Sequence, residues 1–263
     1  MTGLKGSELK KRIAKGQQVF GTWVSITDPK MTRLFTQLGF DFLLIDLEHS
    51  TVDRETVQNM LLMFAGTPTC PIVRVPWHEP HWTKWILDAG AEGILFPNVT
   101  SAEQARELAA QCKYPPEGSR GFFPTGASNF LIDLDEYMDG INDRILVWMQ
   151  IEHVQGIQNM EEIMAVPGLD AVLIGPADLS FSLGIGNQYD HPDFNAALAQ
   201  IFAKAKAAGM PVAYHMYDIS EAALEKGKEA SIFSFGFDFI FARLGAQQAL
   251  ARVQNGLGIT PKP

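Results

Sequence analysis

The sequence predicts a (β/α)8 TIM barrel, and two observations support this fold class. Short apolar, β-rich runs alternate with amphipathic stretches along the whole chain, which is typical of βα units and a parallel sheet. Eight such runs are present, and eight βα repeats favour a closed barrel over an open doubly wound sheet. The predicted strands are residues 19–24, 42–47, 71–75, 93–96, 145–151, 171–174, 211–214 and 237–242.

The stretches between these runs have the spacing of helices that cover a core. Their apolar residues recur three and four positions apart. Gly39, Gly90 and Gly209 each follow such a stretch, where a left-handed cap is expected. Ser101 and Ser220 stand where a helix needs an N-cap. The clearest predicted helices are residues 54–64, 102–112, 194–208 and 220–229.

One connection, residues 114–140, is longer than the others and contains two adjacent prolines and several glycines. Long structured loops in compact domains are usually functional, so we expect no domain boundary here. The prediction is a single barrel domain over residues 1–263. Within it, residues 1–18 form a helical lead-in and residues 258–263 a flexible tail.

Composition excludes several classes of protein. The net charge of -9 leaves no basic surplus to neutralise phosphates, so nucleic acid is not an expected partner. Cys70 and Cys112 lack metal-type spacing, and so few cysteines are typical of a reduced cytosolic protein. Residues 1–18 are polar and lysine-rich and lack the apolar central segment of a signal peptide, and no run approaches the ~20 apolar residues that span a bilayer. We therefore expect a cytoplasmic protein that does not bind membranes.

Polar residues at strand ends are the candidates for chemistry, because a barrel of this kind builds its active site at the carboxyl ends of its strands. Four predicted strands end in such residues: Asp46, Glu48 and His49 after the second, Arg74 at the third, Gln150 and Glu152 at the fifth, and Asp178 after the sixth.

Glu152 and Asp178 follow consecutive strands, so both carboxylates would reach one point above the barrel. Two carboxylates with water in the remaining positions suit Mg2+ or Mn2+, and Co2+ or another divalent cation is a further candidate. In the alternative interpretation, each acid only caps the helix that follows it. Their place on neighbouring strands favours the metal site.

Arg74 follows a fully apolar strand and has two interpretations of equal weight. Its guanidinium would stabilise the oxygen of an enolate next to the metal. Alternatively it pairs with Asp46 inside the barrel mouth. His49 lies just beyond the second strand, and a carboxylate such as Asp88 would orient it as a proton shuttle.

Several cofactors and mechanisms are not implied. The chain has no GxGxxG after its first strand and no GxxxxGK[ST], so NAD, FAD and ATP are not expected. None of the predicted strands ends in lysine, which favours a metal over a Schiff base for aldol chemistry. The backbone N–H groups of residues 175–180, where a strand turns into a helix, would instead hold the carboxylate of a keto acid.

From about residue 20 to about residue 257, the chain resembles the HpcH/HpaI family of metal-dependent pyruvate aldolases. The motifs occur in the right order and are specific together, although each is weak alone. They are Phe40-Asp41-Phe42, Asp46-Leu47-Glu48-His49, Val73-Arg74-Val75-Pro76, Asp88-Ala89-Gly90-Ala91-Glu92-Gly93-Ile94, Gln150-Ile151-Glu152 and Ile174-Gly175-Pro176-Ala177-Asp178-Leu179-Ser180.

The resemblance implies reversible retro-aldol cleavage of a 4-hydroxy-2-oxo acid to pyruvate and an aldehyde. Glu152 and Asp178 would hold the metal that pyruvate chelates, and Arg74 would bind the keto or enolate oxygen. His49 with Asp88 would serve as the acid–base pair.

For substrate binding and assembly the resemblance implies more. Gln150, Ala177 and Asp178 would contact the pyruvate. The C-terminal helix would be exchanged between protomers of a homo-oligomer, a hexamer built as a trimer of dimers. Phe123 and Gly126 stand where relatives often have Gly and Arg, which suggests an aldehyde that is less anionic or that is recognised by another residue.

Other functions of the same site stay open. One is decarboxylation of oxaloacetate, and another is lyase chemistry on an acyl-CoA ester. The short chain and the lack of a basic patch for CoA phosphates argue against the second. A third, from another class, is a non-catalytic barrel that binds a keto acid as a sensor. Metal-dependent exchange of pyruvate methyl protons would separate an enzyme from a sensor.

Overall fold

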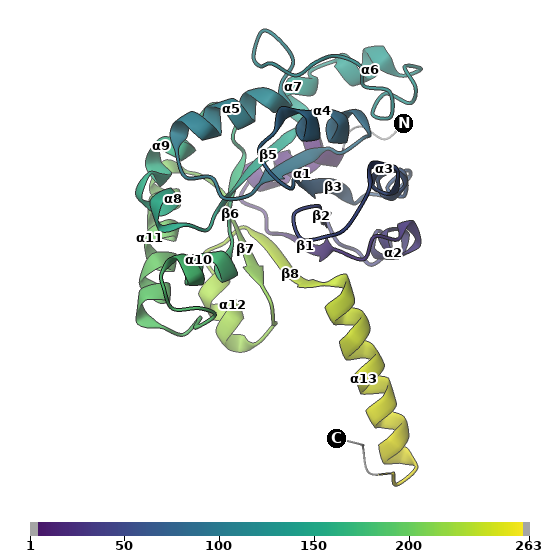
Figure 1. Cartoon of the computed structure of the whole chain (residues 1–263), viewed down its shortest axis with the longest axis vertical. Coiled ribbons are helices and arrows are strands. Elements are labelled where there is room, and N and C mark those ends of the chain that lie inside the picture. Colours follow the sequence, from purple (N-terminus) through teal and green to yellow (C-terminus); the bar gives the residue numbers. More distant parts are fainter. Residues whose placement is uncertain (1–4, 260–263) are drawn as a thin grey trace.

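The computed structural model describes residues 5–259, in which eight parallel strands close into a barrel in sequence order (Figure 1). Each strand pairs with its neighbours in the chain, and β8 pairs with β1 to complete the ring. The fold class predicted from the alternating pattern is confirmed. The strands are β1 Val19–Val24, β2 Phe42–Asp46, β3 Cys70–Arg74, β4 Gly93–Phe96, β5 Leu146–Ile151, β6 Ala171–Ile174, β7 Val212–Met216 and β8 Ile232–Phe237.

Helices connect the strands and surround the barrel (Figure 1). They are α1 Lys5–Ala14, α2 Pro29–Phe35, α3 Arg54–Leu62, α4 Pro80–Asp88, α5 Ala102–Cys112, α6 Leu134–Met138, α7 Ile141–Arg144, α8 Val154–Gln158, α9 Met160–Met164, α10 Pro176–Ser182, α11 Pro192–Ala208, α12 Glu221–Gly227 and α13 Asp238–Gly256.

The core has two layers because successive strand residues point to opposite faces. In β2, Phe42 and Leu44 join the cluster inside the barrel, whereas Leu43 and Ile45 pack against the surrounding helices. Trp148 fills the interior and meets Phe42 edge to face at 5.2 Å between ring centroids. The interior is therefore packed, and a ligand has room only at an end of the barrel.

Helix α1 covers the amino end of the barrel and adds apolar side chains to its interior cluster. Within the predicted lead-in of residues 1–18, the helix runs over Lys5–Ala14. Three carboxylates that directly precede β2, β4 and β6 bind this helix: Asp41 meets Arg12 Nη1 at 2.6 Å, Glu92 accepts the Gly6 N–H at 2.7 Å, and Asp170 meets Lys10 Nζ at 2.8 Å.

Cap residues and left-handed glycines lie where the sequence placed them. The hydroxyls of Ser101 and Ser220 accept backbone N–H groups at the starts of α5 and α12. The predicted left-handed glycines have positive φ values, which are 89° at Gly39, 113° at Gly90 and 65° at Gly209.

The long connection of residues 114–140 contains α6 and three consecutive residues in the left-handed region. Their φ values are 51° at Asn129, 56° at Phe130 and 68° at Leu131.

The predicted eighth strand is wrong. The strand runs over Ile232–Phe237, and residues 238–242 begin helix α13. The aromatic run of residues 237–241 has β propensity, but pairing with β1 and β7 selects the preceding segment. Gly236, with φ of 62°, turns the chain, and the Asp238 carboxylate accepts the Ile26 N–H at 2.8 Å, which fixes the helix start.

Helix α13 extends away from the barrel (Figure 1) and exposes apolar residues along its length. Its exchange between protomers stays a prediction. Part of the predicted tail, residues 260–263, lies outside the described residues. Within the part of the chain that the structure covers, no helix combines the length and hydropathy of a membrane span.

Candidate active site

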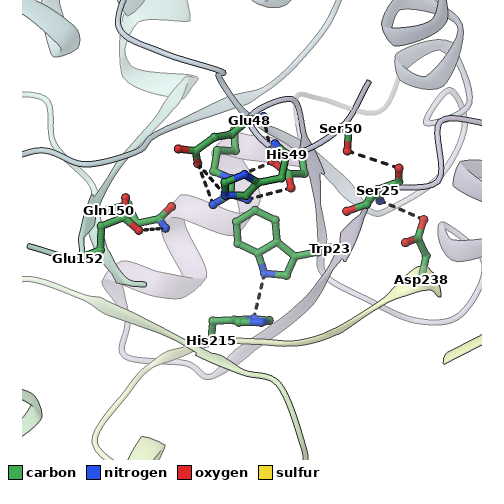
Figure 2. A network of polar contacts seen from close by, with 11 residues as sticks. Trp23, Ser25, Glu48, His49, Ser50, Gln150, Glu152, His215 and Asp238 are labelled. Atoms are coloured by element: carbon green, nitrogen blue, oxygen red, sulfur yellow. Dashed lines mark hydrogen bonds and ion pairs between the residues drawn. The ribbon is translucent and has the colours of Figure 1, made fainter. Parts of the chain in front are cut away.

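A cavity of about 450 Å³ opens at the carboxyl ends of the strands. This is the end at which barrel enzymes carry their sites. Six of the seven predicted site residues are found in the cavity or beside it, and Figure 2 shows the polar contacts around it. Among the residues that line it are Trp23, Asp46, His49, Arg74, Gln150, Gly175, Ala177, Asp178, His215, Tyr217, Phe237 and Phe239.

Glu152 directly follows β5 and is held by the residues around it. Its Oε1 accepts the backbone N–H of Asn98 at 2.7 Å, and the Gln150 amide donates to Oε2. Gly175 at the end of β6 leaves space for this carboxylate, since a Cβ there would lie 2.3 Å from Glu152 Oε2. The carboxylate is therefore buried and fixed in one orientation.

Asp178 stands in the first turn of α10, directly after β6. Because β5 and β6 are paired neighbours, Asp178 and Glu152 share one edge of the barrel mouth. Burial, followed by the charge of Asp178, raises the pKa of Glu152 to about 8. The two carboxylates thus act on each other electrostatically.

These residues fit a divalent cation. A buried carboxylate with a raised pKa, next to a second carboxylate, lacks a positive charge that a metal ion would supply. Hard oxygen donors are the ligands of Mg2+ and Mn2+. Within residues 5–259, three or more His, Cys, Asp or Glu side chains do not gather at one point, so protein groups alone would not complete the shell. Water and a substrate would complete it.

Arg74 at the end of β3 binds carboxylates on two sides and remains part of the cavity wall. Its Nε and Nη2 meet both oxygens of Asp46 at 2.9 and 2.8 Å, and its Nη1 lies 3.0 Å from Glu48 Oε2. The Trp23 ring lies 4.3 Å from Cζ. The predicted pairing with Asp46 is therefore present, and it orients a cation that also faces the cavity.

The predicted His49–Asp88 pair is not formed within this chain. Asp88 Oδ1 accepts from Arg120 Nη2 at 2.7 Å, and the Arg120 side chain is fully buried. A buried guanidinium needs a counter-ion, and Asp88 supplies it. The His49 side chain is 63% exposed, and its Nε2 lies 3.8 Å from Glu48 Oε2. Glu48 is thus the carboxylate beside His49.

The start of α10 presents backbone donors to the cavity. Ala177 and Asp178 occupy the first turn, whose N–H groups have no partner within a helix. Gly175 at the N-cap supplies no side-chain hydrogen bond to them. Gln150 Oε1 is buried and has no hydrogen-bond partner among the described residues. Free polar groups therefore face the place where a keto-acid carboxylate was predicted.

The two departures from the family pattern, Phe123 and Gly126, lie in the long connection of residues 114–140. Gly126 packs on the chain at the end of α4, since a Cβ there would lie 2.9 Å from the Ala89 carbonyl oxygen. Phe123 is exposed. His153, which directly follows Glu152, caps α8, where its Nδ1 accepts the Gln155 N–H at 3.1 Å.

Sequence reasoning missed Trp23 and His215, which also line the cavity. Trp23 Nε1 donates to His215 Nδ1 at 3.0 Å (Figure 2). Both residues lie near the carboxyl ends of their strands, β1 and β7. Inspection of those strand ends, with β7 continued to Met216, would have found them.

The fold and the site define a barrel enzyme with an acidic, arginine-containing cavity at the carboxyl ends of its strands. Residues 19–243 match the model of the HpcH/HpaI aldolase/citrate lyase family. The chain belongs to this family, and the predicted class of enzyme, a carbon–carbon lyase, is confirmed.

Individual relatives span most of the chain. A hydroxypyruvate/pyruvate aldolase of Roseobacter denitrificans is 39% identical over 206 residues, 76% of this chain and 80% of the relative. A 5-keto-4-deoxy-D-glucarate aldolase of Escherichia coli is 35% identical over 78% of this chain and 80% of its own length. The crystal structure of an HpcH/HpaI aldolase/citrate lyase family protein from Burkholderia cenocepacia has a TM-score of 0.89 and 31% identity, and covers 94% of this chain and 99% of that one.

Proposed function

We propose that the chain is a divalent-metal-dependent pyruvate aldolase that cleaves a 4-hydroxy-2-oxo acid reversibly to pyruvate and an aldehyde. The observation that carries the proposal is the buried Glu152 carboxylate, which lies near Asp178 in a cavity that also contains Arg74. Relatives named hydroxypyruvate/pyruvate aldolase and 5-keto-4-deoxy-D-glucarate aldolase support the reaction class.

Glu152 and Asp178 would hold Mg2+ or Mn2+. The bound cation would act as a Lewis acid on the keto group of the substrate. The neighbouring residues prepare this place: Gln150 and the Asn98 N–H orient the Glu152 carboxylate, and Gly175 keeps the space around it open.

The chain's own groups would bind the 2-oxo acid at two points. Arg74, fixed by Asp46 and Glu48, would donate to the keto oxygen as negative charge develops there. The N–H groups of Ala177 and Asp178 would bind the carboxylate, because the first turn of a helix attracts anions.

His49 would transfer the proton between the acceptor hydroxyl and solvent. It lies at the rim of the cavity, where the aldehyde must enter, and its ring is exposed. The Glu48 carboxylate lies 3.8 Å from its Nε2. Within one chain Asp88 would take no part in this step, because its carboxylate forms an ion pair with Arg120.

The test replaces each carboxylate by its amide. We expect Glu152→Gln and Asp178→Asn to abolish metal-dependent release of pyruvate while circular dichroism stays unchanged. Glu92→Gln is the matched control, because Glu92 is also buried but lies at the opposite end of the barrel. Turnover that survives exhaustive chelation, or that survives both amide substitutions, would contradict the proposal.

The assembly and the substrates are further proposals. The exposed apolar face of α13 supports a homo-oligomer, and the family resemblance suggests a hexamer formed as a trimer of dimers. Small keto acids and aldehydes are the proposed ligands, and composition favours the cytoplasm. Light scattering of the full chain tests the hexamer, since the monomer has a mass of 29.0 kDa.

A further inference from the structure

The loop that follows β4 contains a residue with an unusual backbone conformation. Asn98 has a φ of 48°, in the left-handed region that non-glycine residues rarely adopt. Such a conformation costs free energy and persists only where the surrounding structure holds it. The Asn98 N–H donates to Oε1 of Glu152 at 2.7 Å. The unusual residue therefore supplies the backbone donor to the proposed metal ligand.

The other end of the same peptide unit binds a histidine from another loop. The carbonyl oxygen of Pro97 lies 2.6 Å from Nε2 of His78, in the connection between β3 and α4. The C=O and N–H groups of a trans peptide lie in one plane and point in opposite directions. The Pro97–Asn98 peptide thus lies between His78 and Glu152, and it cannot rotate without losing both contacts.

A glutamine determines which nitrogen of this histidine donates. Oε1 of Gln104 accepts the Thr100 N–H at 2.8 Å, which fixes the orientation of the Gln104 amide. The amide nitrogen lies 2.8 Å from Nδ1 of His78, and Nδ1 must accept because an amide nitrogen only donates. The proton of the neutral ring is therefore on Nε2, where it donates to the Pro97 carbonyl.

Other contacts hold the imidazole and the loop in place. The ring of His78 stacks on Trp77 with 4.8 Å between ring centroids. Gln111 Nε2 donates to the His78 carbonyl oxygen at 3.2 Å. On the loop itself, the Val99 N–H donates to the carbonyl oxygen of Gln150 at 3.2 Å. The histidine is thus fixed on its own side, and the loop is attached to the strand that leads to Glu152.

These contacts oppose a rotation of the Pro97–Asn98 peptide. Rotation by about half a turn would bring the φ of Asn98 to the negative values that L residues prefer. It would also direct the Pro97 carbonyl oxygen toward the Glu152 carboxylate, where two negative groups repel each other. Without the histidine, relief of backbone strain favours the rotated peptide, and Glu152 then loses the N–H that orients it.

We propose that His78 is a positioning residue of the metal site, because it holds the Pro97–Asn98 peptide in the orientation whose N–H binds Glu152. The inference rests on the proposed function, in which Glu152 is a ligand of a divalent cation. Partners that orient a metal ligand typically contribute about 10–100-fold to metal affinity. His78 contributes in this way without contact with the metal or the substrate.

The first test measures Mn2+ affinity by isothermal titration calorimetry. His78→Phe keeps a flat ring that can stack on Trp77 but has no donor or acceptor. We expect this substitution to raise the dissociation constant for Mn2+ by about tenfold or more. His81→Phe is the matched control, because His81 lies in the first turn of α4 and is exposed. It should bind Mn2+ as the wild type does.

A second substitution separates the orientation of the peptide from a general loss of stability. Glycine adopts positive φ without strain, so Asn98→Gly keeps the N–H and lowers the cost of the left-handed conformation. In the His78→Phe background, we expect Asn98→Gly to restore part of the lost Mn2+ affinity. Unchanged affinity in His78→Phe, or no restoration in the double variant, would overturn the inference.

An NMR measurement without metal observes the peptide itself. The sequence has a single Pro–Asn pair, so protein labelled with carbonyl-13C proline and 15N-asparagine gives one HNCO signal, from Pro97–Asn98. We expect the Asn98 amide proton to shift upfield in His78→Phe, because it loses its bond to a carboxylate. A signal that does not move would count against the inference. Should the wild type bind no Mn2+, the proposed function fails, whereas this signal still decides whether His78 holds the peptide.

Discussion

At the amino end of the barrel three carboxylates each contact a partner on one helix, whereas at the carboxyl end an arginine pairs with two of four carboxylates. The first three precede alternate strands, and helix α1 supplies each with a cation or an N–H group. At the other end Arg74 is the one lysine or arginine, within the described residues, that forms an ion pair with them. The four are Asp46, Glu48, Glu152 and Asp178.

The difference indicates that the amino end of the barrel contributes to stability and the carboxyl end to ligand binding. A carboxylate that already has a partner requires no bound ligand, so the charges at the amino end are balanced once the chain has folded. The carboxyl end retains excess negative charge at a cavity, where burial, followed by the charge of Asp178, raises the pKa of Glu152. Excess negative charge at a cavity is tolerated when a ligand neutralises it, and the proposed metal ion would do so and would bind the keto acid there.

The largest effect should come from removing the one cation at the carboxyl end. We expect Arg74→Ala to lower turnover by about 10²–10³, the scale for loss of one donor to a developing oxyanion. It should also destabilise the fold by about 3–5 kcal/mol, because the buried Asp46 carboxylate loses its counter-ion and keeps only backbone N–H partners. Steady-state kinetics well below the melting temperature, together with urea unfolding, measure the two effects.

Arg74→Lys is the matched control. It keeps the positive charge and loses the two-pronged contact with Asp46, so it should recover stability more than activity. A loss of turnover of tenfold or less in Arg74→Ala would restrict Arg74 to a structural role.

A smaller effect should appear in the metal-free protein. The pKa of Glu152 is raised to about 8, so the folded state holds a proton that the unfolded state releases near pH 4.5. Its contribution to stability is complete below about pH 4.5 and is lost as pH rises through about 8. In the presence of chelator, Glu152→Gln should therefore melt a few degrees above the wild type at pH 8 and show a smaller difference at pH 5.

Metal addition provides the control for this stability difference. Mn2+ should raise the melting temperature of the wild type and have little effect on Glu152→Gln. Parallel melting curves of the two chelated proteins across this pH range would show that the carboxylate is not under electrostatic strain.

At the amino end, a tight contact should affect stability alone. A Cβ at Gly6 would lie 2.9 Å from the Glu92 carbonyl oxygen and 3.1 Å from that of Arg144. Gly6→Ala must therefore shift helix α1, at a cost of about 1–3 kcal/mol. We expect lower stability in urea with unchanged kcat. A loss of kcat would mean that the two ends of the barrel are coupled and would break the contrast between them.

Most of the fold could be predicted because each strand is a short apolar run bounded by turn residues. The exception is residues 238–241, which follow Phe237 in a β-prone run, yet the left-handed Gly236 and the contacts of the Asp238 carboxylate place them in a helix. These contacts are made with N–H groups of the loop after β1, which no local pattern contains.

The candidate site could be predicted where it depends on strand ends, as for Glu152, Asp178 and Arg74. It could not be predicted where it depends on partners from distant segments. Asp88 pairs with Arg120 of the long loop. His215 is oriented by a hydrogen bond from Trp23, which lies 192 positions earlier in the chain. Side-chain pairing across the barrel requires the fold itself.

The smallest effect should come from removing a cation at the amino end, which makes the comparison with Arg74 direct. Lys10 is 30% exposed on its side chain, and it binds Asp170 at 2.8 Å. Asp170 keeps a second partner after the substitution, because its Oδ2 accepts the Val147 N–H at 2.9 Å. We therefore expect Lys10→Ala to cost about 0.2–1 kcal/mol, to leave kcat unchanged and to have less effect in 1 M salt. Urea unfolding at low and high salt measures this, and a cost similar to that of Arg74→Ala would show that the two ends do not differ as their contacts suggest.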